Sequence, residues 1–155
     1  MTKTIINPED GIKAYLNGMI KMREQFNMHM KEHQFASFEE LILGKGRQMH
    51  NPKFIKGGAM KECFKNSYNL MQKKGYTYCE GYAMGIIPVL HAWCLDKKGN
   101  VVDPTWKDGT EYYGIPFKTE YVLETAIKRE YYGIIDNWQD RWPLLVKFND
   151  EVVQK

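Results

Sequence analysis

The sequence lacks the features of several protein classes. It has only three cysteines among 155 residues, without a CxxC spacing, so neither a disulfide framework nor a structural zinc site is expected. No apolar run approaches the ~20 residues that span a bilayer, and the N-terminus shows no charged segment followed by a long apolar stretch, as a signal peptide would. The net charge of +3 is small for a nucleic-acid binder. We therefore expect a cytoplasmic protein with reduced thiols and with neither a membrane nor a nucleic acid as partner.

The chain also lacks repeats, low-complexity tracts and linkers, which predicts a single domain over residues 1–155. Hydrophobic residues make up 43% and aromatic residues 14%, which is enough to form a core without stabilising disulfide bonds. We divide the domain into N-terminal helices (1–45), a central part (57–106) and a C-terminal helix and strand that complete the core (107–155).

Helical periodicity dominates the N-terminal part. Apolar side chains recur at helical spacing over residues 10–32, with Pro8 just inside the expected start. Ser37 and Glu40 fit a capping box for a second helix, and Gly44 fits its C-terminal stop. Glycines, a proline and several cations indicate a loop over residues 45–59, and a further helix follows, ended by Gly75.

After Gly75 the pattern changes to aromatic and β-branched residues broken by Gly81, Gly85 and Pro88. We predict two strands over residues 76–96, then the polar turn "DKKGN" and a third strand in "VVDPTW" that ends at Pro104.

Residues 118–130 predict a helix capped by Thr119, and residues 131–135 a late strand. The tail with Trp138 and Trp142 is expected to pack as a cap on the core. Helices first, then a helix leading into an antiparallel sheet, indicate an α+β fold.

The turn brings one imidazole and one carboxylate together. If Leu95 pairs with Val101, His91 and Asp103 become diagonal neighbours on one face, roughly 7–8 Å apart at the backbone. An aspartate placed there can orient one ring nitrogen and leave the other free, as in catalytic triads. A slip of one residue would separate the two groups.

The chain also offers a nucleophile. Cys63 comes near the start of the helix that follows Gly57 and Gly58, where unpaired N–H groups and the helix dipole stabilise a thiolate and can hold an oxyanion. Cys79 and Cys94 lie within strands, and alternation turns Cys94 away from His91. We expect these two thiols to be core packing.

These segments resemble a known family. "HAW" followed by a turn and "VVDPTW" is similar to the His and Asp signature of the transglutaminase-like superfamily, within the papain-like cysteine enzymes. "ECFKNSYNLMQKKG" resembles the family's nucleophile helix, and "YTYCEGYA" resembles the strand beneath its site. The resemblance covers residues 57–106 and extends to short phage and bacterial proteins. It implies a compact papain-like core and a triad of Cys63, His91 and Asp103.

Some features depart from the family pattern. Glu62 stands where many members carry Trp or Gly, and an acidic neighbour counts against activation of the thiol. The oxyanion donor is expected to be the backbone N–H of Cys63, with the side chains of Gln48 and Asn51 as candidates. No acidic calcium-binding cluster occurs, so no metal and no cofactor are predicted.

Several further residues are candidates for binding. We expect Tyr82, Trp93 and Trp106 to line a substrate pocket. The cations Lys45, Arg47, Lys53 and Lys56 form either a solvated loop, the favoured reading, or a clamp for an anionic group. His29 and His33 have a helical metal-binding spacing but no third ligand, which favours a solvated helix face.

The predicted function is cysteine-dependent acyl chemistry: amide hydrolysis or acyl transfer through a thioester, on a peptide, a protein or a small amide. One alternative is an inactive transglutaminase-like domain that binds peptides or proteins. Another is an acyltransferase that uses a thioester donor. The sequence leaves the oligomeric state open.

Overall fold

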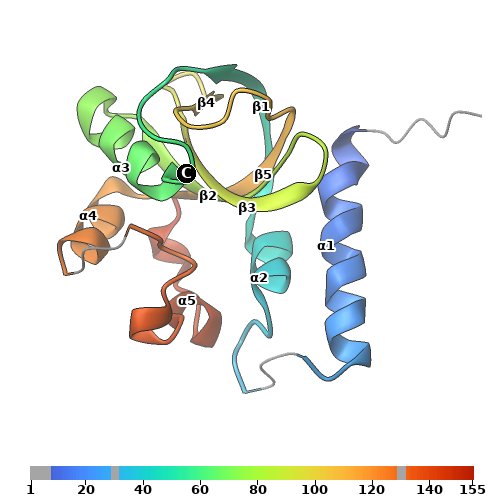
Figure 1. The fold of residues 1–155 in the computed structure, drawn as a ribbon. Coiled ribbons are helices and arrows are strands. Elements are labelled where there is room, and N and C mark those ends of the chain that lie inside the picture. Colours follow the sequence, from blue (N-terminus) through green and yellow to red (C-terminus); the bar gives the residue numbers. More distant parts are fainter. Residues whose placement is uncertain (1–7, 29–31, 129–131) are drawn as a thin grey trace, which may run out of the picture.

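Five strands close into a small barrel, and helices pack on its outer surface (Figure 1). The computed structural model describes residues 8–28, 32–128 and 132–155. The strands are β1 (Arg47–Phe54), β2 (Thr77–Met84), β3 (Pro88–Leu95), β4 (Asn100–Asp103) and β5 (Glu111–Phe117). The α-helices are α1 (Pro8–Gln25), α2 (Phe38–Lys45), α3 (Cys63–Lys74), α4 (Thr119–Ile127) and α5 (Pro143–Val146), with 3-10 turns at Trp138–Asp140 and Asp150–Val152. The expected α+β class is confirmed at this level.

The strand order is β1-β4-β3-β2-β5, and β1 closes the barrel by pairing with β5. All pairs are antiparallel except β1 with β4, which are parallel. The sheet is therefore a closed barrel with one parallel pair, not the simple antiparallel sheet that the sequence predicted. Side-chain alternation divides each strand between the barrel interior and the helices outside. Seven buried residues form the interior cluster: Met49, Cys79, Ala83, Trp93, Leu95, Val101 and Tyr112.

Close backbone approach between β2 and β5 depends on glycine. A Cβ atom on Gly114 would lie 2.5 Å from the Glu80 carbonyl oxygen and 2.7 Å from the Trp93 ring. Gly81 pairs with Gly114 across the two strands and has equally little room. The two glycines therefore let β2 and β5 meet over the buried indole.

Helix boundaries agree with the predicted signals in part. Ser37 caps α2 by accepting a hydrogen bond from the Glu40 N–H (3.2 Å), and Gly75 ends α3 in the left-handed conformation (φ 69°), as predicted. However, α2 continues through Gly44 to Lys45, because its C-cap is Gly46, whose N–H donates to the Ile42 carbonyl.

Other boundaries were predicted wrongly. The first helix stops at Gln25, short of the predicted residue 32, and residues 29–31 lie outside the described residues. Thr119 does not cap α4; Lys118 occupies the N-cap and makes no side-chain cap hydrogen bond.

The predicted loop over residues 45–59 contains β1. Only Met49 is buried in this strand, so the alternation that signals a strand is missing. The left-handed φ of 55° at Asn51 marks the irregular pairing with β4 between His50 and Lys53.

The C-terminal part also differs from the prediction. The last strand is β5 (Glu111–Phe117), and residues 132–135 are not a strand. Instead, the backbone N–H groups of Ile134 and Ile135 donate to the buried carboxylate of Glu80. This carboxylate takes the place of a strand partner and anchors the C-terminal segment on β2.

The C-terminal tail packs on the outer core, as expected, through Leu144, Leu145 and Phe148. Trp142 is partly buried against the same core, whereas Trp138 is exposed. None of the helices in the described ranges combines the length and apolar character that crossing a membrane requires.

Candidate active site

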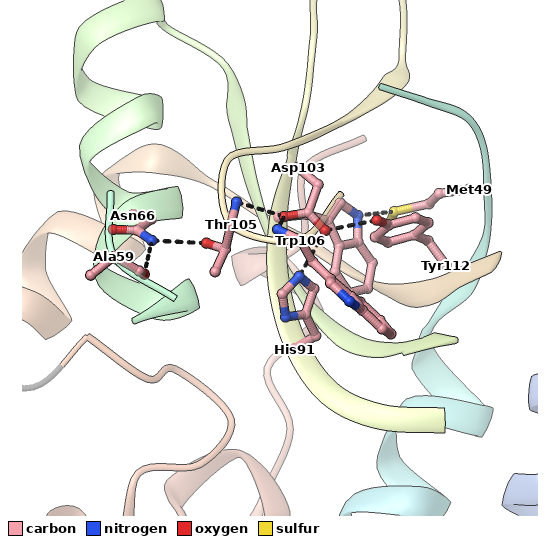
Figure 2. Close-up of polar contacts among 9 residues, drawn as sticks. Met49, Ala59, Asn66, His91, Asp103, Thr105, Trp106 and Tyr112 are labelled. Carbon is pink, nitrogen blue, oxygen red and sulfur yellow. Dashed lines mark hydrogen bonds and ion pairs between the residues drawn. The ribbon is translucent and has the colours of Figure 1, made fainter. Parts of the chain in front are cut away.

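His91 and Asp103 meet at one end of the barrel. The Nε2 atom of His91 lies 2.8 Å from Oδ2 of Asp103, and both side chains are buried (Figure 2). The predicted register brings them together: Leu95 pairs with Val101 and Cys94 with Val102. The two-residue alternation then places His91, Trp93 and Asp103 on the side of the sheet that faces the barrel interior.

The Asp103 carboxylate has a complete set of hydrogen-bond donors. Its Oδ2 atom also accepts the Tyr112 hydroxyl (2.7 Å), and its Oδ1 atom accepts the backbone N–H groups of Thr105 and Trp106 (both 2.9 Å). Burial alone would raise the pKa of Asp103. The hydrogen bond and charge of His91, together with these other donors, outweigh burial, so that the pKa is below its usual value. Asp103 is therefore a buried anion held by four donors.

Aromatic side chains hold the His91 ring in place. Trp93 stacks on it at 22° with ring centroids 6.3 Å apart, and Trp106 contacts it edge-on at 5.5 Å. The Trp93 indole N–H donates to the sulfur of Met49 (3.2 Å) and has no exposed surface. Trp93 therefore supports the ring from inside the barrel, whereas half-buried Trp106 is available at the surface.

Cys63 is the first residue of α3, the helix that packs on β3 and β2. Its side chain is partly buried against the core. The preceding residue, Glu62, is the N-cap and makes no side-chain cap hydrogen bond. The N–H groups of the first turn therefore receive no acceptor from their N-cap side chain, and the positive end of the helix dipole lies at the turn that begins with Cys63.

The His91 ring interacts with both Asp103 and Cys63. Burial lowers the pKa of His91, but the hydrogen bond to Asp103 and the electrostatic interactions with Asp103 and Cys63 raise the pKa to about 9. Because Nε2 faces Asp103, the second ring nitrogen, Nδ1, is the one available to the thiol. Figure 2 shows this nitrogen directed away from Asp103. Of the sequence-predicted triad, His91 and Asp103 are joined by a hydrogen bond, and Cys63 influences the His91 ring electrostatically.

The other two cysteines lie elsewhere. Cys79 is fully buried in the barrel interior, and Cys94 is buried on the outer face, where its thiol donates to the Ser67 carbonyl (3.2 Å). Burial raises the pKa of both thiols. They therefore remain neutral thiols at physiological pH, as expected for packing residues.

Asn66 positions the start of α3, and the sequence did not predict this role of Asn66. Its Nδ2 group donates to the Ala59 carbonyl and to the Thr105 hydroxyl (both 2.9 Å), which ties the helix to the segment after Asp103 (Figure 2). Gly58 has a φ of 151°, and a Cβ there would lie 2.0 Å from Oδ1 of Asn66. The one signal in the sequence is an amide at a core-facing position of an amphipathic helix.

Three other predicted site residues do not join the triad. Tyr82 points to the outer face of β2, where its ring lies 5.8 Å from that of Tyr15 on α1. Gln48 alternates with Met49 and so faces away from the barrel interior, and its side-chain oxygen is buried without a partner among the described residues. Asn51 is exposed and donates to the Asn100 side chain (3.1 Å).

Two of the four candidate clamp cations lie within ion-pair distance of a carboxylate. Lys45 forms an ion pair with Asp150 (2.8 Å), and Lys53 lies 3.9 Å from Asp96. Arg47 and Lys56 are exposed. Such exposed contacts contribute little to stability, and the arrangement agrees with a solvated surface.

Of the predicted histidine pair, His29 lies outside the described residues, and His33 is not in a helix. Within the described ranges, no three His, Cys, Asp or Glu side chains gather as metal ligands would. Comparison with protein-family models, with curated proteins and with solved structures finds no match to the chain.

Proposed function

We propose that the protein is a papain-like cysteine enzyme of the transglutaminase type, which transfers acyl groups through a thioester on Cys63. One observation carries the proposal: the buried His91–Asp103 pair, joined through Nε2 at 2.8 Å, lies close enough to Cys63 at the start of α3 for the thiol to raise the pKa of the ring. A nucleophile beside a base that an orienting carboxylate holds is the recognised arrangement for covalent acyl chemistry.

In the first half of the reaction, the Cys63 proton resides on His91 and the sulfur attacks the carbonyl carbon of an amide. A carbon–sulfur bond forms, and the carbonyl electrons move to oxygen, where the Cys63 backbone N–H can stabilise the oxyanion. Collapse of this intermediate breaks the carbon–nitrogen bond. His91 returns its proton to the departing amine, which leaves a thioester.

In the second half, neutral His91 takes a proton from water, and the hydroxide attacks the thioester. The carbon–sulfur bond breaks, the acid is released and the imidazolium–thiolate pair is restored. An acceptor amine in place of water gives acyl transfer by the same steps. Asp103 keeps the Nε2 proton in place throughout and stabilises the imidazolium, so that Nδ1 exchanges the proton with sulfur and substrate.

Alkylation kinetics test the nucleophile directly. Iodoacetamide at pH 7 is expected to label Cys63 at least about tenfold faster than the same residue in His91→Ala, since only thiolate reacts. The buried Cys79 and Cys94 are internal controls in the same mass-spectrometric digest and should remain unlabelled while the protein is folded.

Acylation tests the covalent step. With p-nitrophenyl acetate, the wild-type protein should release one nitrophenolate per chain in a rapid burst and gain an acetyl mass on Cys63. Cys63→Ser should show no burst. Slow alkylation that is identical in wild type and His91→Ala, together with no acyl adduct, would contradict the proposal and favour the alternative of an inactive binding domain.

A further inference from the structure

Half of the large apolar side chains that the described residues expose lie in two segments connected to the residues of the candidate triad. The described residues expose twelve large apolar side chains, and six of them lie in two short segments: Phe54, Ile55 and Met60 in one, and Ile86, Ile87 and Val89 in the other. Ile86 is 95% exposed and Met60 is 74% exposed. Apolar side chains that form a contiguous exposed patch are characteristic of interaction sites.

The first segment, residues 54–60, lies along the strand that carries the carboxylate and leads into the thiol. The Ile55 N–H donates to the Asp103 carbonyl (3.0 Å), and the Gly57 N–H donates to the Pro104 carbonyl (2.8 Å). Met60 comes three residues before Cys63. This apolar segment therefore borders the site on the side of α3.

The second segment, residues 86–89, is the turn between β2 and β3 and leads into His91. Val89 lies two residues before His91 and so shares its face of β3. A Cβ on Gly85 would lie 3.2 Å from the Trp106 ring, which in turn contacts the His91 ring edge-on. Trp106 therefore joins the turn to the imidazole.

The two segments lie on opposite sides of the site. Figure 1 shows α3 on one side of the barrel and the β2–β3 turn on the other, next to the start of α1. Beyond Ile86 the surface continues into a cavity of about 560 Å³ between the turn and α1, lined among others by Ala14, Tyr15, Met84 and Pro88. This volume accepts a large apolar side chain.

From this arrangement we infer that the substrate is a polypeptide segment that crosses the end of the barrel with apolar side chains on both sides of the reacting amide. Only a chain that continues in both directions from the carbonyl can cover residues 54–60 and 86–89 together. A fatty acyl donor has its apolar chain on one side, and a small amide covers neither segment. The inference rests on the proposed function, because it names the substrate class of the same site.

Thiol-reactive peptides with a central electrophile test this inference. In an epoxysuccinyl probe, the Cys63 thiolate opens the epoxide: a carbon–sulfur bond forms, a carbon–oxygen bond breaks and the oxygen takes the His91 proton. Four probes carry Leu-Leu or Ser-Ser on either flank in all combinations. Each apolar flank is expected to raise the labelling rate of Cys63 by about tenfold or more, the effect of a few buried methylene groups.

Exposed positions provide matched variants that leave the triad intact. Ile86→Ser with Ile87→Ser should abolish the preference at one flank, and Met60→Ser should reduce it at the other. Ile127→Ser is the control, because Ile127 is 79% exposed on α4, away from the two segments. It should leave all four labelling rates unchanged. Melting temperatures verify that each variant is folded.

The outcomes separate the inference from the proposed function. Equal rates for all four probes, with Cys63 still activated towards iodoacetamide by His91, would overturn the inference alone. A preference at only one flank would also overturn it and indicate a one-sided apolar acyl chain. If Cys63 is not activated towards iodoacetamide, the proposed function fails, and the inference fails with it.

Discussion

Replacing Asp103 by Asn tests how the buried carboxylate controls the His91 ring. Asparagine keeps the shape of the side chain, and its amide oxygen can still accept the N–H groups of Thr105 and Trp106. Its amide nitrogen then faces Nε2 of His91 and donates, so the ring must accept at Nε2 and carry its proton on Nδ1. The proton would lie between the ring and the thiol in the tautomer that cannot act as a base.

The magnitude follows from the His91 pKa, which the folded protein raises from 6.5 to about 9. A pKa raised by this amount corresponds to about 3 kcal/mol of unfolding free energy. Because the folded state favours the protonated ring, this contribution is fully present below pH 6.5 and is lost as the pH rises through 9. Asp103→Asn should therefore destabilise the protein most near pH 6, and the difference from wild type should narrow towards pH 10.

Two measurements follow this variant. NMR titration of the ¹³Cε1 signal of His91, identified by its loss in His91→Gln, should give a pKa near 9 in wild type and one that falls towards 6.5 in Asp103→Asn. Urea unfolding between pH 6 and 10 should show the converging stabilities. The acyl-transfer rate should drop by roughly 10³–10⁴-fold, as expected for a triad whose histidine has the wrong tautomer.

Tyr112→Phe is the matched control, because it removes one hydrogen bond to the same oxygen of Asp103 without changing the charge. It should cost about 1 kcal/mol of stability and leave the His91 pKa close to 9. An unperturbed His91 pKa in wild type, or one that does not change in Asp103→Asn, would refute the reasoning.

Three further predictions concern stability. Burial raises the pKa of Glu80 to about 7, so the folded state favours the protonated side chain. This preference contributes about 3 kcal/mol to the unfolding free energy, which is present below pH 4.5 and lost as the pH rises through 7. Glu80→Gln should flatten this part of the pH profile of urea unfolding, and an unchanged profile would contradict the assignment. Gly114→Ala places a methyl group 2.5 Å from a carbonyl oxygen and should lower the unfolding free energy by about 1–3 kcal/mol. Gly18→Ala on α1, where a methyl group meets nothing within 4 Å, should raise the unfolding free energy by about 0.5–1 kcal/mol. Calorimetry that ranks the two variants in the opposite order would contradict this prediction. Ser37→Ala removes the cap of α2 and should cost about 1 kcal/mol, and no loss in thermal unfolding would argue against that cap.

Local patterns were sufficient to predict the central part of the molecule. A short polar turn between two apolar strands determines the register, and the register determines that His91 and Asp103 share a face. The glycine after two lysines predicted where α3 ends. These signals all lie within a few residues of the features that they determine.

Long-range contacts explain what the sequence did not show. β1 is almost entirely exposed, so it has no periodic pattern, and its pairing with β4 and β5 joins distant parts of the chain. For the same reason Tyr112 and Asn66 could not be assigned to the site. Side-chain alternation also applies to Tyr82 and Gln48. However, which face of their strands the helices cover depends on the closure of the barrel, so the sequence alone did not show where these two side chains point.

The closing strand has a mechanical consequence for the thiol. β1 is the last strand of the barrel before the chain reaches Cys63, and the segment after it is tied to Asp103 and Pro104 by the backbone N–H groups of Ile55 and Gly57. If this largely exposed strand frays, the segment that leads to Cys63 loses its attachment while the hairpin that carries His91 stays intact. The proposed reactivity of Cys63 would then be lost at temperatures where most of the protein still retains its native structure.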